Sequence, residues 1–374
     1  MIKVTGKHNT ALCFTDDVDE KAYQQIKTLC DQVEFEDCKI RIMPDVHAGM
    51  GCTIGTTMTI TDKIVPAMVG VDIGCGIETI KLSNRKIDYT TLDNLIRKEI
   101  PSGTGIRKYS HNFNQMIDLK QLKCSNKVKL DRAEKSIGSL GGGNHFIEVA
   151  QDGQGFLYLL VHSGSRHLGN EVAMYYKNLA IKKLQEEAIK KEERVSLPRD
   201  LSYLSGKLFS DYLHDMKIVQ EYAALNRQAI CEVIMTAIDL EEVERFTTIH
   251  NYVDIESMIL RKGAVSAQEA EMLLIPLNMK EGSFICQGKG NKDWNYSAPH
   301  GAGRLLSRTK ALETLSLQEY KDSMQGIFTT SVSRKTLDEA PLAYKSAKEI
   351  VKHIDPSVEI IDKIKPTYNF KAPG

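Results

Sequence analysis

The stretch FLYLLVHSGSR, residues 156–166, joins a run typical of a buried strand to a polar loop. Six apolar or aromatic residues precede His162, and such a run fits a strand that is covered on both faces. Arg166 follows four residues after His162, and the planar fork of an arginine suits a phosphate. Because loops on rigid strands often hold ligands, we expect a binding site here. The alternative is a structural histidine beside a surface arginine.

Similar short runs rich in Val, Ile and Thr recur along the chain, bounded by Gly, Pro or Asp, and predict further strands. They are CKIRIMP (38–44), TIGTTMTI (53–60), IETIKLS (77–83), FIEVA (146–150), RFTTIH (245–250) and GSFICQG (282–288). Helical periodicity over 171–194 and 212–240, with a loop between them, predicts two helices. We therefore expect an α/β (mixed α+β) fold with mixed sheets. It would form one large domain over residues 1–374, with a helical excursion over 170–240.

The composition is that of a soluble globular protein. Of the 374 residues, 42% are hydrophobic and 26% are charged, and no apolar run is long enough to span a membrane. Lys+Arg and Asp+Glu both number 49, which argues against a protein that coats nucleic acid by bulk charge. The N-terminus lacks a secretion signal, and the eight cysteines lack the spacing of a disulfide framework. We expect a cytoplasmic protein that makes no membrane contact.

The segment VGVDIGCGIE, residues 69–78, places Asp72 and Cys75 three residues apart among glycines. Glycines permit a tight turn that aims both side chains at one point. A carboxylate and a thiolate together suit a borderline-soft metal ion. The alternative is a buried turn with an inert cysteine.

The segment SLGGGNHFIEV, residues 139–149, places Asn144 and His145 after three glycines and before a predicted strand that carries Glu148. Glycines in a row indicate that something approaches the backbone closely. His145 is therefore a candidate metal ligand. A flexible turn is the alternative, and a phosphate-binding loop is a third interpretation, although the Walker lysine pattern is absent.

Two further segments carry histidines near the ends of predicted strands. RFTTIHNYVD, residues 245–254, places His250 at a strand end, where a structural histidine is the alternative. In RIMPDVHAGMGCTIGT, residues 41–56, Asp45 and His47 lie two residues apart. In an extended segment they share one face and could bind or orient a polar partner. An Asx-type turn is the alternative.

Together these segments supply enough ligands for one or two first-row divalent ions. The candidate ligands are Asp72, Cys75, His145, His162 and His250. Two ions that share the thiolate would suit this set, and ligand softness favours zinc or manganese.

The segment PHGAGR, residues 299–304, surrounds His300 with small residues. Helical spacing downstream predicts that this segment feeds a helix, whose first turn would then be an anion site. A neutral His300 beside Arg304 and Arg308 could attack a phosphorus atom, with space for a nucleotide. The alternative is a capping histidine at a helix start.

The motifs VGVDIGCG, GGGNHF, VHSGSR, HNY and HGAGR, in this order, resemble the RtcB family of RNA ligases. MPDVHAGMGCTIG and APLAYKSAKEIV are also similar to family segments, so the resemblance covers nearly the whole chain. It implies a single RtcB-like domain with a deep metal-containing cleft. It also implies an enzyme dependent on Mn²⁺ and GTP that joins RNA 3′-phosphate or 2′,3′-cyclic phosphate ends to 5′-hydroxyl ends.

The resemblance also implies roles for individual residues. The five candidate ligands would hold two manganese ions, with Cys75 bridging, and His300 would take GMP from GTP. Phosphates would be held by Asn144, Arg166 and Arg304. The other nucleotide contacts would be Phe146, Glu148, Ala302, Gly303 and, near the end of the chain, Lys371. Asp45 or His47 would position RNA or a proton.

One segment departs from the family pattern. IPLNMKEGSFICQG, residues 275–288, has Leu277 and Asn278 where relatives have a small pair. This resembles a second branch found with a release-factor-H-like partner, which favours repair of translation-machinery RNA over tRNA splicing. Two other functions stay open: a metal-dependent phosphoesterase that uses activated water on RNA ends, and a catalytically silent RNA-binding protein.

Overall fold

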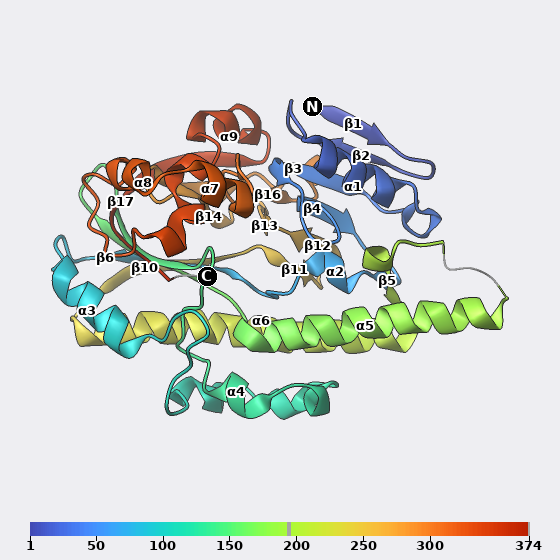
Figure 1. Cartoon of the computed structure of the whole chain (residues 1–374), viewed down its shortest axis with the longest axis horizontal. Coiled ribbons are helices and arrows are strands. Elements are labelled where there is room, and N and C mark those ends of the chain that lie inside the picture. The colour runs from blue at the N-terminus through green and yellow to red at the C-terminus, as the bar shows by residue number, and fades with distance from the viewer. Residues whose placement is uncertain (193–195, 373–374) are drawn as a thin grey trace.

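The computed structural model describes residues 1–192 and 196–372, whose strands build two large sheets (Figure 1). The seven-stranded sheet has the order β10 (Glu242–Ile249), β6 (Gly76–Leu82), β8 (Leu157–Ser163), β7 (Phe146–Gln151), β17 (Val358–Lys371), β15 (Gly282–Gly288) and β14 (Met272–Asn278). The six-stranded sheet has the order β1 (Ile2–Thr5), β2 (Thr10–Cys13), β3 (Ile40–His47), β4 (Ile54–Thr59), β12 (Ile259–Lys262) and β11 (Asn251–Asp254). Two short pairs are β13 (Ala264–Ser266) with β16 (Ser297–Pro299), and β5 (Lys63–Ile64) with β9 (Leu204–Ser205).

The two longest helices lie side by side along one side of the sheets (Figure 1). They are α5 (Arg166–Lys190) and α6 (Gly206–Ala237). The others are α1 (Glu20–Cys30), α2 (Pro66–Val69), α3 (Tyr89–Glu99), α4 (Leu130–Glu134), α7 (Arg308–Thr314), α8 (Leu317–Ser323) and α9 (Ala347–Ile354). Short 3-10 turns are η1 (Val33–Phe35), η2 (Asn112–Met116), η3 (Leu119–Gln121), η4 (Ser125–Lys127), η5 (Arg199–Leu201), η6 (Lys292–Trp294), η7 (Arg334–Glu339) and η8 (Pro341–Ala343). Within the described ranges, none of the helices has the length and apolar character that crossing a membrane requires.

The strand β8 lies inside the seven-stranded sheet, antiparallel to both β6 and β7, and all of its residues are buried. On one face Leu159 and Val161 pack in a cluster with Ile230 of α6. On the other face Tyr158 and Leu160 pack in a cluster with residues of β14, β15 and β17. Because both faces are covered, the sequence of this strand is apolar without alternation.

The mixed α/β fold predicted from the sequence is confirmed. Each of the seven predicted strands is present, with ends shifted by a few residues at most. The helices α5 and α6 occupy most of the segment 170–240, although residues 193–195 of that segment lie outside the described residues. The single-domain organisation stays a prediction.

The prediction that His300 lies at the start of a helix was wrong. The helix α7 begins at Arg308, where the side chain of Ser307 accepts a hydrogen bond from the Lys310 N–H. The residues between are held in a loop instead, because the N–H groups of residues 305 and 306 donate to the carbonyl of Ala343. Gly303 has φ of +76°, a left-handed conformation that also prevents a helix from starting there. The anion site at a helix start is therefore not available to His300.

Candidate active site

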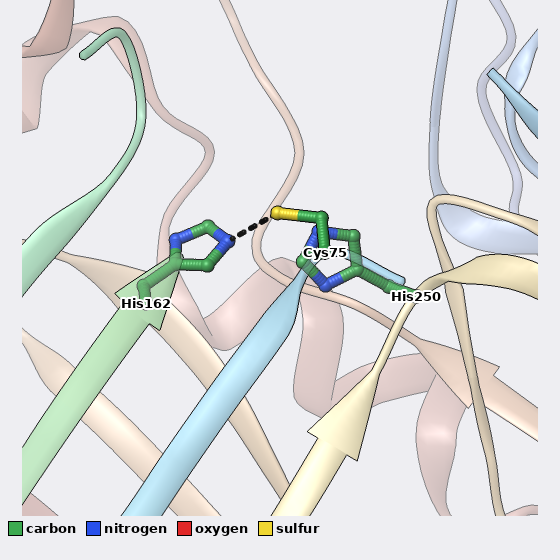
Figure 2. A group of neighbouring side chains, drawn as sticks. All are labelled: Cys75, His162 and His250. Carbon is green, nitrogen blue, oxygen red and sulfur yellow. Dashed lines mark hydrogen bonds between the residues drawn. The ribbon is translucent and has the colours of Figure 1, made fainter. Parts of the chain in front are cut away.

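The candidate metal ligands gather at one edge of the seven-stranded sheet. Cys75 directly precedes β6, and His145 directly precedes β7. His162 lies near the end of β8, and His250 directly follows β10. Because the neighbours in the order β10-β6-β8-β7 are antiparallel, the start of one strand lies beside the end of the next. Figure 2 shows Cys75, His162 and His250 converging from three adjacent strands.

The donor atoms of these residues are close enough to share metal ions. Cys75 Sγ lies 3.3 Å from His162 Nε2 and 3.4 Å from His145 Nε2. His145 Nε2 lies 3.0 Å from Asp72 Oδ2. The donor atoms of Cys75, His162 and His250 lie within 4.8 Å of one another, as do those of Asp72, Cys75 and His145. The first group forms a metal-binding site, and the second group shares its thiolate.

The histidines are prepared to act as ligands. Burial holds the pKa of both His162 and His250 well below the usual range, so their rings are neutral and keep a lone pair. The other ring nitrogen of His145, Nδ1, lies 2.9 Å from the carbonyl oxygen of Leu140. A hydrogen bond from Nδ1–H to this carbonyl fixes the ring with Nε2 toward the cluster, where a bound metal ion would take the place of the proton shared with Asp72.

The two anionic ligands differ in their proton affinity. Burial would raise the pKa of Asp72, but the hydrogen bond and charge of His145 hold it well below the usual range. The backbone N–H of Ser165 also donates to Asp72 Oδ1, at 2.9 Å. Burial, followed by the nearby Asp72, holds the pKa of the Cys75 thiol well above its usual range. A cation is therefore needed to stabilise the thiolate, which fits a metal site.

A glycine makes room for Arg166 beside the cluster. Gly141 has φ of +94°, and a Cβ there would lie 1.9 Å from Arg166 Nη1 and 2.6 Å from His145 Nδ1. The Arg166 backbone itself has φ of +55°, a conformation that non-glycine residues rarely adopt. Its guanidinium donates to the Gly103 carbonyl at 2.7 Å and to Ser139 Oγ at 3.2 Å. These bonds fix the arginine against the loop that carries His145.

The histidine of the PHGAGR segment is oriented by a buried carboxylate. His300 follows β16, and its Nδ1 lies 2.6 Å from Oδ2 of Asp45 in β3. The same oxygen accepts the backbone N–H of His300 at 3.1 Å. Asp45 is fully buried, and the ring of His300 lies 5.1 Å from the ring of His250. The nucleophile candidate therefore stands next to the metal ligands, with Nε2 free of the carboxylate.

The second residue of the Asp45/His47 pair has a different partner. His47 Nδ1 lies 3.0 Å from the backbone oxygen of Asp45, not from its carboxylate. Burial lowers the pKa of His47, so this ring is neutral at neutral pH. The structure thus separates the pair: Asp45 contacts His300, whereas His47 faces the cavity described next.

A cavity of about 220 Å³ opens between the metal ligands and the C-terminal strand. Most of the residues predicted to bind nucleotide line it, together with two of the metal ligands. The lining residues include His47, Asn144, Phe146, Glu148, His162, His250, His300, Ala302, Gly303, Arg304 and Lys371. The candidate ligands Asp72, Cys75 and His145 lie outside the lining, and so do Asp45 and Arg166.

The cavity lining includes a buried carboxylate, Glu339, that no sequence motif indicated. Glu339 Oε2 accepts from Lys371 Nζ and from the Tyr344 hydroxyl, both at 2.6 Å. Its Oε1 lies 3.2 Å from Arg304 Nη1 and 3.1 Å from Arg308 Nη2. Burial would raise the pKa of Glu339, but the charges of Lys371 and Arg308 hold it at about 2. The carboxylate is therefore ionised, and it orients three cationic side chains.

The second acidic residue of the cavity is protonated instead. Burial raises the pKa of Glu148 to about 8, although Asn369 donates to its Oε2 at 2.7 Å. Lys371 is paired with Glu339, so Glu148 has no cation bonded to it among the described residues. At neutral pH the Glu148 side chain is therefore an uncharged carboxylic acid.

The segment IPLNM, residues 275–279, which differs from the family pattern, forms one wall of the cavity. Leu277 is buried and lines the cavity with Asn278. The side chain of Asn278 accepts from the N–H groups of Lys280 and Glu281, at 3.0 and 2.9 Å. This bonding closes the turn between β14 and β15, so the two unusual residues shape both the turn and the wall.

Several residues of the site carried no sequence signal on their own. Tyr344 lies in the segment APLAYKSAKEIV, and Glu339 directly precedes it. That segment resembles the family as a whole, without a role for either residue. Asn369 lies in the last strand. Each appears polar and ordinary in sequence. The partner of Glu339, Lys371, is more than 30 residues away, and the partner of Asn369, Glu148, is more than 200 residues away. Tyr344 acts through the nearby Glu339.

Comparisons with known proteins point to one family. A model of the family described as tRNA-splicing ligase RtcB matches residues 29–372. The RNA-splicing ligase RtcB of Escherichia coli K12 is 33% identical in an alignment 362 positions long, and the alignment covers 86% of this chain and 87% of the relative. The tRNA-splicing ligase RtcB of Methanococcus maripaludis is 28% identical in an alignment 397 positions long that covers 82% of each chain. The RNA-splicing ligase RtcB2 of another Escherichia coli strain is 26% identical in an alignment 394 positions long that covers 96% of this chain and 93% of the relative.

We predict that Glu148→Gln raises thermal stability at high pH. The folded protein holds the Glu148 proton up to about pH 8, whereas an unfolded chain releases it above its ordinary pKa of 4.5. The wild-type protein therefore loses stability as pH rises from about 5 to 8, and the glutamine variant does not. Melting temperatures measured by circular dichroism at pH 5, 6, 7 and 8 should show a gap that widens with pH. A constant gap would contradict the raised pKa.

We also predict that Gly141→Ala disturbs the arginine and the cluster together. The new Cβ would overlap Arg166 and His145 in a left-handed conformation, at a cost of about 2 kcal/mol or more. The matched control is Gly153→Ala, because a Cβ at that position meets nothing within 4 Å. Calorimetry should give a lower melting temperature and weaker manganese binding for the first variant only. Equal behaviour of the two would contradict the close approach.

Proposed function

The chain belongs to the RtcB family of ligases, and from that premise we propose that it joins RNA ends through a covalent histidine–GMP intermediate on His300. Its substrates would be RNA 3′-phosphate or 2′,3′-cyclic phosphate ends and 5′-hydroxyl ends. One observation carries the proposal: His300 is hydrogen-bonded to the buried Asp45 at 2.6 Å and stands beside the metal ligand His250. A histidine held this way presents one free nitrogen to a phosphorus atom in the cavity.

The chemistry of the first step follows from this orientation. Nε2 of His300 attacks the α-phosphorus of GTP, and the bond to the bridging oxygen breaks as pyrophosphate leaves with the electron pair. The Nδ1 proton stays on the ring and forms a hydrogen bond to the Asp45 carboxylate. Positive charge that develops on the ring therefore faces a carboxylate, in the way that an aspartate supports a catalytic histidine.

The donor set supports two divalent metal ions. A buried sulfur shared by two groups of ligands, one of which holds the neutral imidazoles of His162 and His250, fits a bridged pair. Asp72, Cys75 and His145 would hold one ion, and Cys75, His162 and His250 the other. When bound, such ions offset negative charge on a triphosphate. Manganese is the ion that we propose, and zinc suits the same ligands.

The part of the cavity lined by Glu148 and Lys371 suits a guanine base. Guanine presents N–H donors beside a carbonyl acceptor, which complement a carboxyl group and an ammonium group. Glu148 and Lys371 both line the cavity, and Lys371 is held in place by Glu339. Phe146, Ala302 and Gly303 add apolar and backbone surface. We assign these residues to nucleotide binding.

The remaining steps transfer the guanylyl group to RNA. Water first opens a cyclic phosphate to a 3′-phosphate. An oxygen of that phosphate attacks the guanylyl phosphorus, and the P–N bond breaks with return of the electron pair to His300. The 5′-hydroxyl then attacks the activated 3′-phosphate, and GMP leaves. Phosphates would be bound by Asn144, Arg166 and Arg304. Asp45 would orient His300, and His47 would position RNA. The guanidinium of Arg304 already bonds to Glu339 and to the Leu306 carbonyl.

Other parts of the proposal rest on the sequence alone. They are the release-factor-H-like partner, repair of translation-machinery RNA or tRNA splicing, the cytoplasmic location and the single-domain organisation. The alternative function, a metal-dependent phosphoesterase, uses the same ligands but needs no reactive His300. The carboxylate that orients His300 favours the ligase.

We predict that His300→Ala abolishes covalent labelling. Wild-type protein incubated with Mn²⁺ and GTP labelled at the α-phosphate should gain an acid-labile, alkali-stable label. Asp45→Asn should be labelled at least about a hundredfold more slowly, because the ring loses its charged partner. His214→Ala is the control, since this exposed histidine bonds only the Gln121 carbonyl among the described residues. Unlabelled wild type, or an equally labelled His300→Ala, would favour the phosphoesterase.

We predict that Cys75→Ala loses bound manganese, because one sulfur serves both groups of ligands. Metal content after gel filtration, measured by mass spectrometry, should fall toward zero. Cys13→Ala removes another buried cysteine, from β2 of the other sheet, and should keep the metal. Unchanged metal content in Cys75→Ala would rule out a bridging thiolate.

A further inference from the structure

Two adjacent residues of α6 contact the loops that carry the metal ligands, and the structure assigns to Asn226 and Arg227 the role of positioning those ligands. Both side chains are fully buried. Neither residue was singled out in the sequence, and neither lines the cavity. The inference rests on the metal site of the proposed function and names the residues that hold it in shape.

Asn226 joins two ligand loops. Its Oδ1 accepts from the backbone N–H groups of Gly138 and Ser139, at 2.9 and 3.1 Å. Its Nδ2 donates to Ser163 Oγ at 2.9 Å and to the Gly164 carbonyl at 3.0 Å. The amide therefore uses its full hydrogen-bonding capacity. The first loop leads to His145, and the second follows His162.

A chain of hydrogen bonds continues from Asn226 to a ligand. Ser163 Oγ, which accepts from Asn226, donates to the Leu140 carbonyl at 2.7 Å. The same carbonyl lies 2.9 Å from His145 Nδ1. The orientation of the His145 ring is thus set through two intermediate groups by a side chain on α6.

Arg227 holds the third loop. Its Nη1 donates to the Gly74 carbonyl at 2.8 Å and to the Ser163 carbonyl at 3.2 Å. Gly74 directly precedes Cys75, and Ser163 directly follows His162. Nε and Nη2 of Arg227 have no hydrogen-bond partner within residues 1–192 and 196–372. A guanidinium buried with unpaired donors is costly, so packing alone is a poor reason for this residue.

The backbone of the third loop also presses against α6. Gly74 has φ of +72°, and a Cβ there would lie 2.9 Å from Gln220 Cα and 3.2 Å from Ala223 Cβ. The Gly74 N–H donates to the Asn251 carbonyl, and the His250 N–H donates to the Cys75 carbonyl. The loop that carries Cys75 is therefore clamped between the helix and the segment that carries His250. Glycine-rich turns are flexible by themselves, so this clamp supplies the rigidity that a metal site needs.

The test measures Mn²⁺ binding to the full-length chain by isothermal titration calorimetry, with no nucleotide or RNA present. We expect Arg227→Met and Asn226→Ser to bind Mn²⁺ about tenfold to a hundredfold more weakly than wild type. Arg227→Lys should recover part of the affinity, because an ammonium can still donate to the Gly74 carbonyl. All titrations are run well below the melting temperature of each variant, so that only folded protein is compared.

The matched control is Tyr176→Phe in α5. It removes a buried hydrogen bond from the Tyr176 hydroxyl to Asp215 of α6, 2.7 Å long, which contacts no ligand loop. A purely structural role would lower the melting temperature in all variants and leave Mn²⁺ affinity unchanged. That outcome, or equal affinities for wild type and both α6 variants, overturns the inference while the proposed function stands.

A second readout separates ligand geometry from total binding. Co²⁺ bound by a thiolate gives a charge-transfer absorption band in the near ultraviolet. We expect this band to weaken or shift in Arg227→Met, because the backbone that carries Cys75 loses its hydrogen bond from Arg227. An unaltered band in a variant that is folded would contradict the positioning role. If wild-type protein bound neither Mn²⁺ nor Co²⁺, the metal site of the proposed function would fail, and this inference with it.

Discussion

The antiparallel pairing of β8 with β6 and β7 is the interaction on which the site depends. It places the end of β8 beside the starts of its two neighbours, and so brings His162, Cys75 and His145 to one edge. The pairing is stable because β8 is covered on both faces, by α6 on one side and by β14, β15 and β17 on the other. A shift of one residue in this register would turn His162 toward the opposite face and dismantle the cluster.

Charge in the cavity is controlled by partners within the chain. Glu339 meets two arginines and a lysine and is ionised, whereas Glu148 meets an amide and keeps its proton. Two buried carboxyl groups in one cavity thus have opposite protonation states, set by what surrounds them. Asp45 follows the same principle at His300, since its carboxylate is aimed at a ring that becomes positive in the proposed reaction. Glu339 therefore lies beside three cationic side chains, and Asp45 lies beside the ring of His300, which gains positive charge in the proposed reaction.

Much of the fold was predictable from local patterns, and one local pattern misled. The strands were recognisable because their burial leaves continuous apolar runs, and α5 and α6 because of helical periodicity. The helix expected to start near His300 begins at Arg308 instead, since the intervening residues bond to the Ala343 carbonyl. That partner lies about 40 residues further along the chain, so no local window contains it. Because the Ala343 contact is invisible in a local window, the small residues of PHGAGR resemble the start of a helix.

Local sequence patterns indicate the elements and the candidate metal ligands, because glycines mark the turns at the strand ends. Cys75, His162 and His250 could be selected on that trace, and the structure brings them together. Which polar groups orient these ligands depends on contacts that form only in the folded chain. Asp45 and His300 are 255 residues apart, and Asn226 is 88 residues from the glycine whose N–H it accepts. An apolar pattern specifies that a residue is buried, but a hydrogen bond also needs direction and distance, and these exist only when the chain is folded.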